Sequence, residues 1–210
     1  GRYPPYRELA YEACGAAGDT FALGTAGGGY GATTADLKGG LGSASVVTST
    51  GHTVGAMVVV NAIGSAVCGG GPHFWAGSWE IGDEFGGLGA EKHPSHALAW
   101  KGQPVTPATT IAMVATDAKL SKPQAKRLAI AASGGKSKGL RLAHALFDGD
   151  MVFAASTGRR DLADPAQEII EICALASDCL ARAIARGVHA ATALPFPGAL
   201  PSWRDRFGDA

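Results

Sequence analysis

The sequence predicts an α+β fold, because strand-type and helix-type segments both occur and do not alternate strictly along the chain. Two stretches rich in β-branched residues, 44–50 and 53–61, flank a Gly-His pair, which favours a hairpin. Apolar residues recur at helical spacing over 123–132 and again from about 164 to 186. A doubly wound fold, which needs regular alternation, is less consistent with this order.

The composition is that of one globular domain over residues 1–210. The chain has 31 Gly and is 46% hydrophobic, while charged residues make up 17% against about 25% in an average protein. Because 18 basic and 18 acidic residues balance, we expect no binding to nucleic acid or to a membrane. The four cysteines lack a CxxC pair and the start carries no basic-then-apolar signal, which together predict a cytoplasmic protein.

The remaining segments divide into regular and irregular ones. Pro4-Pro5 opens a helix that ends at Gly15. Eight glycines fall between Gly24 and Gly42, which excludes a regular helix and indicates a backbone in close contact with a cleft. Residues 69–107 lack periodicity and are expected to form a long loop that covers the cleft or contacts a partner.

Two further strands and an irregular tail complete the prediction. Residues 110–118 form a buried apolar run, and 151–157 form a second strand-type run. The tail beyond Ala193 carries three prolines and is expected to be irregular.

Three motifs are candidates for binding a cofactor or a metal, but none has the neighbouring residues that such a site needs. Gly27-x-Gly29-x-x-Ala32 loosely matches a dinucleotide fingerprint, but no amphipathic helix or acidic residue follows at the required distance. A GKS triplet lacks the first glycine of a phosphate loop. His93-x-x-His96 has no further ligands nearby in sequence. We therefore expect no cofactor and no metal.

Three polar features are unusual for a purely structural role. Asn61 is the only Asn in the chain and ends an apolar strand, where an amide must have its hydrogen bonds satisfied. Asp148 and Asp150 precede the last strand two positions apart, so alternation points both side chains the same way. Thr109 stands at the start of a buried strand. Taken singly, each has an ordinary interpretation as a strand end, an Asp-Gly turn or a β-branched residue.

Together the three features describe one mechanism. A threonine whose preceding peptide bond is cleaved becomes a self-contained nucleophile, because its own α-amine, with a pKa of about 7.7–8.0, accepts the hydroxyl proton. Carboxylates orient the amine, and an uncharged amide stabilises the oxyanion of the tetrahedral intermediate.

These residues and their surroundings resemble the DmpA-type aminopeptidases, a family of self-cleaving N-terminal-nucleophile amidases that includes L-aminopeptidase/D-esterases, β-peptidyl aminopeptidases and nylon-oligomer hydrolases. The resemblance covers nearly the whole chain. It is carried by Tyr3-Pro4-Pro5-Tyr6-Arg7, 24–31, 38–45, Thr53-Val54-Gly55-Ala56 to Asn61, Thr109-Thr110-Ile111 to Ala118, and Asp148-Gly149-Asp150 to Gly158.

The resemblance implies a role for each candidate residue. Cleavage between Ala108 and Thr109 would divide the chain into a large-subunit portion, 1–108, and a small-subunit portion, 109–210. Thr109 would then be the nucleophile and Asn61 the oxyanion donor. The paired polar residues behind the nucleophile fall on Asp148 and Asp150.

The family also implies an architecture, a substrate class and partners. The fold is a four-layer α/β/β/α sandwich with the active site between two sheets. The substrate is a small peptide or amide, hydrolysed through an acyl-enzyme. The two portions remain partners after cleavage, and a homotetramer or larger assembly is expected. Two alternatives are an acyltransferase of the ornithine acetyltransferase type and a non-catalytic homologue.

The sequence departs from the family pattern in three respects. Family precursors usually have Asn or Gly before the nucleophile, where this chain has Ala108. Lys38 is the nearest match to an active-site lysine of the nylon-oligomer hydrolases. Family members also carry a further segment ahead of the point that matches Gly1, so we expect this chain to leave apolar strand surface uncovered.

Overall fold

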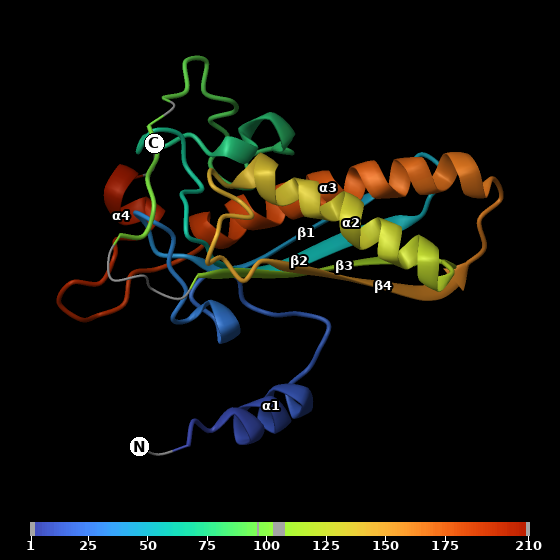
Figure 1. Ribbon diagram of the computed structural model, residues 1–210, viewed down its shortest axis with the longest axis horizontal. Helices are drawn as coiled ribbons and strands as arrows, with labels where there is room; N and C mark the ends of the chain where they lie inside the picture. The colour runs from blue at the N-terminus through green and yellow to red at the C-terminus, as the bar shows by residue number, and fades with distance from the viewer. Residues whose placement is uncertain (1–2, 96, 103–107, 209–210) are drawn as a thin grey trace.

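The structure is a computed structural model that describes residues 3–95, 97–102 and 108–208. A four-stranded sheet runs through it in the order β1-β2-β3-β4 (Figure 1). The strands are β1 (Gly40–Val47), β2 (Thr53–Asn61), β3 (Thr109–Ala118) and β4 (Met151–Arg160). The first three pair antiparallel, and β4 pairs parallel with β3. The predicted hairpin and the α+β class are confirmed.

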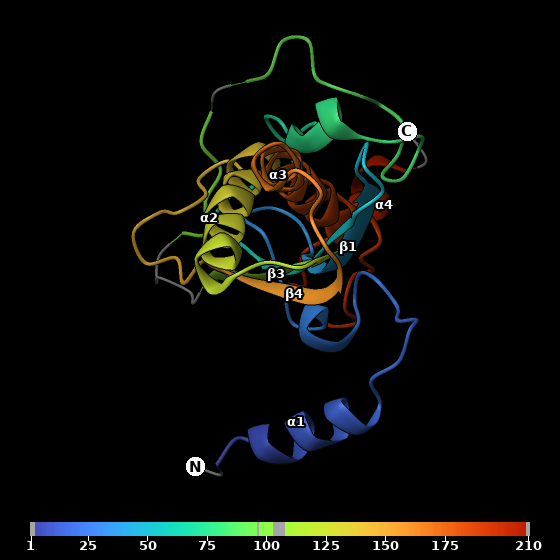
Figure 2. The same ribbon diagram turned by 90° about the vertical axis from the view of Figure 1, so that its right-hand side faces the viewer.

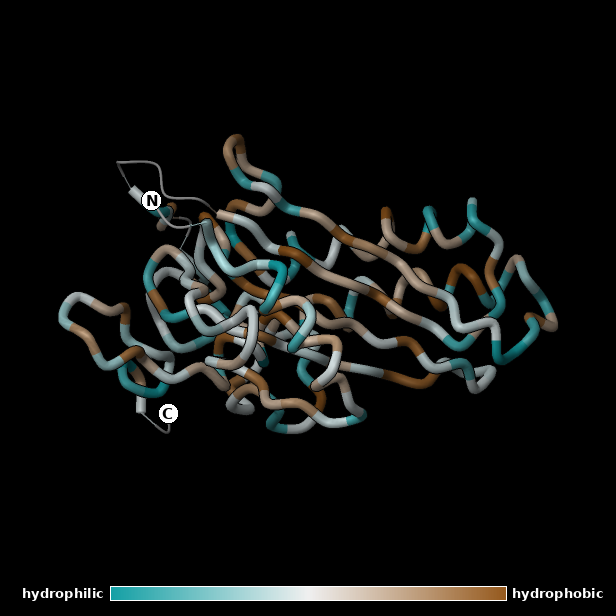
Figure 3. The backbone as a smooth tube through the Cα atoms, turned by 90° about the horizontal axis from the view of Figure 1, so that it is seen from below, coloured by the Kyte–Doolittle hydropathy of each residue, from teal (hydrophilic) through white to brown (hydrophobic). Residues whose placement is uncertain are grey.

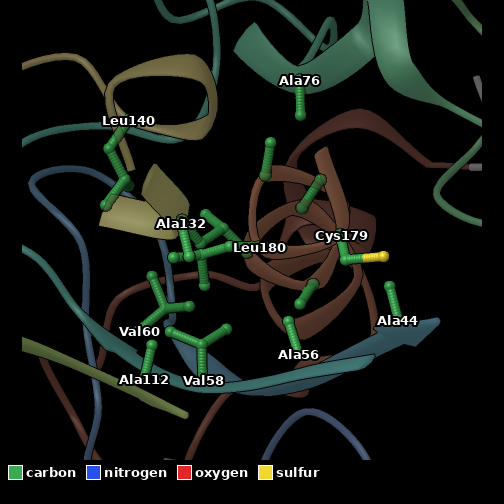
Figure 4. Close-up of a cluster of buried hydrophobic side chains, with 14 of the residues drawn as sticks. Ala44, Ala56, Val58, Val60, Ala76, Ala112, Ala132, Leu140, Cys179 and Leu180 are labelled. Atoms are coloured by element: carbon green, nitrogen blue, oxygen red, sulfur yellow. The ribbon is translucent and has the colours of Figure 1, made fainter. Parts of the chain in front are cut away.

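Two long helices cover one face of this sheet. They are α2 (Lys122–Gly139) and α3 (Pro165–His189), and they lie side by side above the strands (Figures 1 and 2). Helix α2 forms the crossover between the parallel strands β3 and β4. The core lies between these helices and the sheet, where Ala132 and Leu180 stand above Val58 and Val60 (Figure 4). One helical layer and one sheet of the expected sandwich are therefore described.

The opposite face of the sheet is apolar and open in the described part of the chain. Met57, Ile111, Met113 and Phe153 are between 41% and 53% exposed on it. Figure 3 shows the molecule from this side, with hydrophobic stretches along the strands. Helix α1 (Tyr6–Gly15) lies on this side, apart from the sheet, and has no buried residue (Figures 1 and 2). This agrees with the expectation of uncovered strand surface.

The predicted end of α2 was wrong. The spacing indicated a helix over 123–132, whereas the helix continues to Gly139. In the added turns, a Cβ on Gly135 would lie 2.2 Å from the carbonyl oxygen of Ser177. The glycine is therefore needed for close packing against α3.

The prediction of a wholly irregular tail was also wrong. A short helix, α4 (Trp203–Phe207), begins with a capping box in which Ser202 and Asp205 hydrogen-bond each other reciprocally. Trp203 is buried, and its indole N–H donates to the carbonyl oxygen of Pro72 at 2.9 Å. Within the long loop, the 3₁₀ helix η2 (Trp75–Trp79) packs on α3, on the helical side of the sheet (Figure 2).

The glycine run makes backbone contacts in more than one direction. Only some of its members border a cavity, as described below. A Cβ on Gly42 would lie 1.8 Å from the carbonyl oxygen of Ala183 in α3. A Cβ on Gly40 would likewise lie 2.2 Å from the carbonyl oxygen of Gly187. The run therefore seats β1 against α3 as well as shaping a cleft, which corrects the expectation of cleft contact alone.

Gly42→Ala should strongly destabilise the fold, because the added methyl group overlaps a helix carbonyl that has no room to move. We expect a loss of at least about 3 kcal/mol in the free energy of unfolding, measured by urea titration. Gly55→Ala is the matched control, since the nearest atoms to its added Cβ lie 3.8 Å away. Equal unfolding midpoints for the two variants would contradict the close packing of β1 on α3.

Among the described residues, no helix is long and apolar enough to cross a membrane.

Candidate active site

The end of β2 and the start of β3 bring two predicted residues together. Asn61 and Thr109 are direct partners in the antiparallel register. The residue before Thr109, Ala108, forms a parallel bridge with Asp148, which places the segment ahead of β4 beside both of them. Thr109, Asn61, Asp148 and Asp150 therefore meet at one end of the sheet.

The bond between Ala108 and Thr109 lies within a tight hydrogen-bonded arrangement. The Thr109 hydroxyl donates to the carbonyl oxygen of Ala108 at 2.5 Å, and the backbone N–H of Gly149 donates to the same oxygen at 2.9 Å. A Cβ on Gly149 would lie 2.7 Å from Thr109 Oγ1. Only glycine therefore allows this backbone N–H and the hydroxyl to approach one carbonyl together.

Asp150 is held by a buried cation and by backbone donors. Its carboxylate accepts from the N–H of Thr110 at 2.9 Å and lies 3.3 Å from Lys136 Nζ; these side chains are 3% and 1% exposed. Burial alone would raise the pKa of Asp150, but the Lys136 ammonium and the N–H groups of His144 and Thr110 outweigh it and lower that pKa. Asp150 is thus a fixed anion that anchors the start of β3.

The pKa of Asp148 is shifted in the opposite direction. Burial raises its pKa to about 6, and the neighbouring Asp150 carboxylate adds to the rise. Its Oδ1 atom is buried and has no hydrogen-bond partner among residues 3–95, 97–102 and 108–208. The two carboxyl groups therefore differ: the charged form is favoured at Asp150, whereas the pKa of Asp148 is raised to about 6.

Asn61 is fixed through its side-chain oxygen. Oδ1 accepts from the N–H of Thr33 at 3.1 Å and from Lys101 Nζ at 2.9 Å. Burial lowers the pKa of Lys101 to about 8, against the opposing influence of Asp148. An amide oxygen with two donors defines which end of the amide is the acceptor.

A cavity of about 390 Å³ joins these groups to the glycine-rich loop. Its lining is mostly small or aliphatic, and it contains both Thr109 and Asn61. The lining residues are Gly28, Gly31, Ala32, Val59, Asn61, Thr109 and Ile111. A second cavity of about 430 Å³ lies on the Lys101 side of Asn61 and is bordered by polar groups, including those of Thr33 and Thr34.

Lys38 has a different position from the other predicted residues. Its side chain is buried, and Nζ donates to the carbonyl oxygens of Gly29, Ala32 and Gly39 at 2.7–2.8 Å. Burial lowers its pKa to about 8. Lys38 thus holds the loop that lines the cavity, and a chemical role for it stays a prediction.

Two lysines of the site were not predicted. Lys136 belongs to the GKS triplet that was considered only as a failed phosphate loop, and Lys101 lies in the aperiodic stretch. No local signal identifies either one, because their partners stand 14 to 47 positions away in sequence, as in the pairs Lys136–Asp150 and Lys101–Asp148. Within the described ranges no three His, Cys, Asp or Glu residues are placed to hold a metal ion, and His96 lies outside those ranges.

Two solved structures share this fold. A protein from Pyrococcus horikoshii OT3 matches with a TM-score of 0.60 at 24% identity, covering 90% of this chain and 50% of that one. The L-aminopeptidase D-Ala-esterase/amidase of Ochrobactrum anthropi matches with a TM-score of 0.57 at 23% identity, covering 90% and 52%. The latter is described as a prototype for the serine aminopeptidases and as a variant of the Ntn hydrolase fold.

Sequence comparisons give closer relatives. An "uncharacterized aminopeptidase" of Mycobacterium bovis is 37% identical over 224 residues, covering 98% of this chain and 63% of that protein. One of Mycobacterium leprae is 38% identical over 231 residues, covering 93% and 61%. The chain thus spans less than two thirds of the length of these relatives. The model of peptidase family S58 matches residues 5–199. With the family's sequence pattern extending over nearly the whole chain, this protein belongs to peptidase family S58.

Proposed function

We propose that the protein is a self-processing N-terminal-threonine amidohydrolase that acts as an aminopeptidase or small-amide hydrolase. The observation that carries the proposal is the arrangement at Ala108–Thr109. The hydroxyl of Thr109 and the N–H of Gly149 both lie on the carbonyl of the peptide bond that precedes the nucleophile. Membership of a peptidase family and aminopeptidase-named relatives support the same chemistry.

Self-processing starts when Oγ1 of Thr109 attacks the carbonyl carbon of Ala108. The C–N bond breaks, an ester forms between the two residues, and the nitrogen of Thr109 takes up the proton that the hydroxyl gives up, so that it becomes a free amine. Water then hydrolyses the ester and releases the carboxylate of Ala108. The N–H of Gly149 stabilises the oxyanion of this first step, because it already donates to that oxygen at 2.9 Å.

Substrate hydrolysis repeats the chemistry on an external amide. The α-amine of Thr109 takes the hydroxyl proton, Oγ1 attacks the substrate carbonyl, and the protonated leaving amine departs. Water hydrolyses the resulting acyl-enzyme and restores the hydroxyl. Asn61 donates to the oxyanion, and the Asp148–Asp150 pair orients the new ammonium group. The small and aliphatic lining of the cavity suits an uncharged acyl group.

The proposal includes the partners expected from the family. The two portions stay associated after cleavage, since β2 and β3 belong to different portions and pair along eight residue positions. Assembly as a homotetramer or larger and a cytoplasmic location remain predictions.

Intact-mass measurement of the incubated protein tests the proposal. We expect two pieces of 108 and 102 residues (210 − 108 = 102). Thr109→Ala should leave the chain whole, because no hydroxyl remains to attack, and Thr109→Ser should restore cleavage. Thr110→Val is the matched control, since its hydroxyl is buried one position away and has no partner among the described residues. Cleavage of Thr109→Ala at the same bond would overturn the proposal.

A further inference from the structure

We infer that Lys101 is a positioning residue of this site, whose ammonium group fixes the orientation of the Asn61 amide and strengthens it as a hydrogen-bond donor. The inference rests on the proposed function, in which Asn61 donates to an oxyanion. It adds a residue, Lys101, to the site, and it makes hydrogen-bond donation by Asn61 depend on the charge of that residue. Neither the motif pattern nor family membership supplies this.

The hydrogen bonds at Asn61 determine which way its amide faces. Lys101 Nζ lies 2.9 Å from Oδ1 and 3.4 Å from the backbone oxygen of Asn61, and the N–H of Thr33 lies 3.1 Å from the same Oδ1. A flipped amide would place its NH₂ group against two donors. Since both donors are held in place, the amide keeps Oδ1 on the Lys101 side and has its Nδ2 hydrogens as donors.

Lys101 is itself anchored. Its backbone N–H donates to the carbonyl oxygen of Ile63 at 2.9 Å, just beyond the end of β2. The segment just after β2, two residues beyond Asn61, therefore holds the backbone of Lys101. This backbone contact makes Lys101 a part of the site rather than a mobile surface side chain.

The charge of Lys101 acts directly on the amide. An ammonium on Oδ1 makes the hydrogen bond charge-assisted and polarises the amide, so that its N–H groups become stronger donors. The other charged groups that face this region are Asp148 and Asp150, ahead of β4, and Lys136 on α2. Of these, Asp148 favours the charged form of Lys101.

Solvent reaches this ammonium through the second cavity, which both Lys101 and Asn61 line. The lysine therefore exchanges its proton in the folded protein. Because burial lowers its pKa to about 8, the charge on Oδ1 is present below that pH and is lost above it. Donation by Asn61 should weaken over the same range.

The single asparagine of the chain allows a direct test. Protein made by cell-free synthesis with asparagine labelled with ¹³C at Cγ gives one amide carbon resonance, that of Asn61. We would titrate it from pH 5 to pH 10 in Thr109→Ala protein, which stays uncleaved and has no amine at position 109. The expected curve has a step near pH 8 from Lys101 and a separate one near pH 6 from Asp148.

Variants assign the upper step. Lys101→Met should abolish it and keep the lower one, whereas Lys101→Arg should keep the charge and move the step beyond pH 10. Lys119→Met is the matched control, because that lysine is 70% exposed and paired with Asp161, and it should change nothing. A flat Asn61 resonance between pH 7 and pH 10 in the Thr109→Ala protein without further substitutions would overturn the inference. So would an upper step that persists when Lys101→Met is added. If Lys101→Met fails to fold, the test rests on Lys101→Arg, in which an upper step that stays near pH 8 would overturn the inference.

Kinetics of the processed enzyme give the second readout. Lys101→Met should lower kcat about tenfold, the size of one lost charge-assisted hydrogen bond, with KM within twofold. It should also remove a loss of rate above pH 8, and Lys101→Arg should restore most of kcat. The two failures are distinguishable. A flat Asn61 resonance in uncleaved protein overturns this inference and leaves the Thr109 test standing. Cleavage of the Thr109→Ala chain, seen by intact mass, overturns the proposed function. The upper step is then still assigned by its loss in Lys101→Met, because a step from a new amine at position 109 would persist in that variant.

Discussion

Lys136→Met should cost about 3–5 kcal/mol in the free energy of unfolding at neutral pH, because it leaves the buried Asp150 carboxylate without its cation. Lys136 Nζ lies 3.3 Å from that carboxylate, and the two side chains are 1% and 3% exposed. Asp148 stands next to the same carboxylate, so the variant would confine two carboxyl groups without the buried ammonium that contacts Asp150.

The pH dependence of this loss has a defined sign. In the parent protein the pKa of Asp150 is lowered, so its contribution to stability is present above the ordinary value of 3.8 and is lost as the pH falls through the lower folded value. Without Lys136 the folded pKa rises, and the carboxyl pair is best tolerated when protonated. Urea unfolding of Lys136→Met should therefore show the largest loss near pH 8 and the smallest near pH 4.

Lys38→Met is the matched control for this experiment. Lys38 is equally buried, but its ammonium contacts three backbone carbonyls and no carboxylate. Its loss should destabilise the fold by an amount that stays constant between pH 4 and pH 7, below its pKa of about 8. A loss for Lys136→Met that is equally independent of pH would show that its pairing with Asp150 does not govern the stability of the site.

Asn61→Ala should lower substrate turnover by about 10²–10³-fold, the usual effect of removing one oxyanion donor, and should leave self-cleavage in place. The two reactions should respond differently because they use different oxyanion donors. The carbonyl oxygen of Ala108 accepts from Gly149 N–H and Thr109 Oγ1, whereas Asn61 lines the cavity that would receive an external substrate. Turnover is measured with an aminoacyl amide, and self-cleavage by intact mass.

Thr33→Val is the control for Asn61→Ala. It removes a hydroxyl from the second cavity but keeps the backbone N–H that donates to Asn61 Oδ1, so both rates should stay within twofold. A turnover of Asn61→Ala within threefold of the parent would remove Asn61 from the mechanism. Simultaneous loss of self-cleavage would mean that the two steps share one oxyanion donor.

Local pattern was sufficient for most of the elements. The β-branched run 53–61, the apolar run 110–118 and helical spacing in 164–186 predict β2, β3 and α3, because each depends on which side chains of one segment must be buried. The pattern failed where packing overrides propensity. Gly135 continues α2 because it contacts Ser177 of α3, a neighbour 42 positions away that no local window contains (177 − 135 = 42).

The candidate site divides in the same way. Thr109, Asn61, Asp148 and Asp150 were identifiable because each marks the end of a strand-type segment and because their spacing resembles a known family. Lys101 and Lys136 have neither signal, since they do not end a predicted strand and do not belong to the family motifs. Both are single lysines whose importance comes from the groups that folding places within 3.3 Å of them.

The sequence by itself determined the α+β class, the strands and long helices, and the residue types that the proposed threonine chemistry requires, since these depend on periodicity and on the side chains present. Only the tertiary structure decided the charge states at the site. A pKa depends on burial and on neighbours within a few ångströms, and these neighbours come from α2, from the segment before β3 and from the loop before β4. Folding thus places Lys136 beside Asp150 and Lys101 beside Asn61, and turns an unremarkable set of polar residues into a site with one fixed anion and two groups that titrate near neutrality.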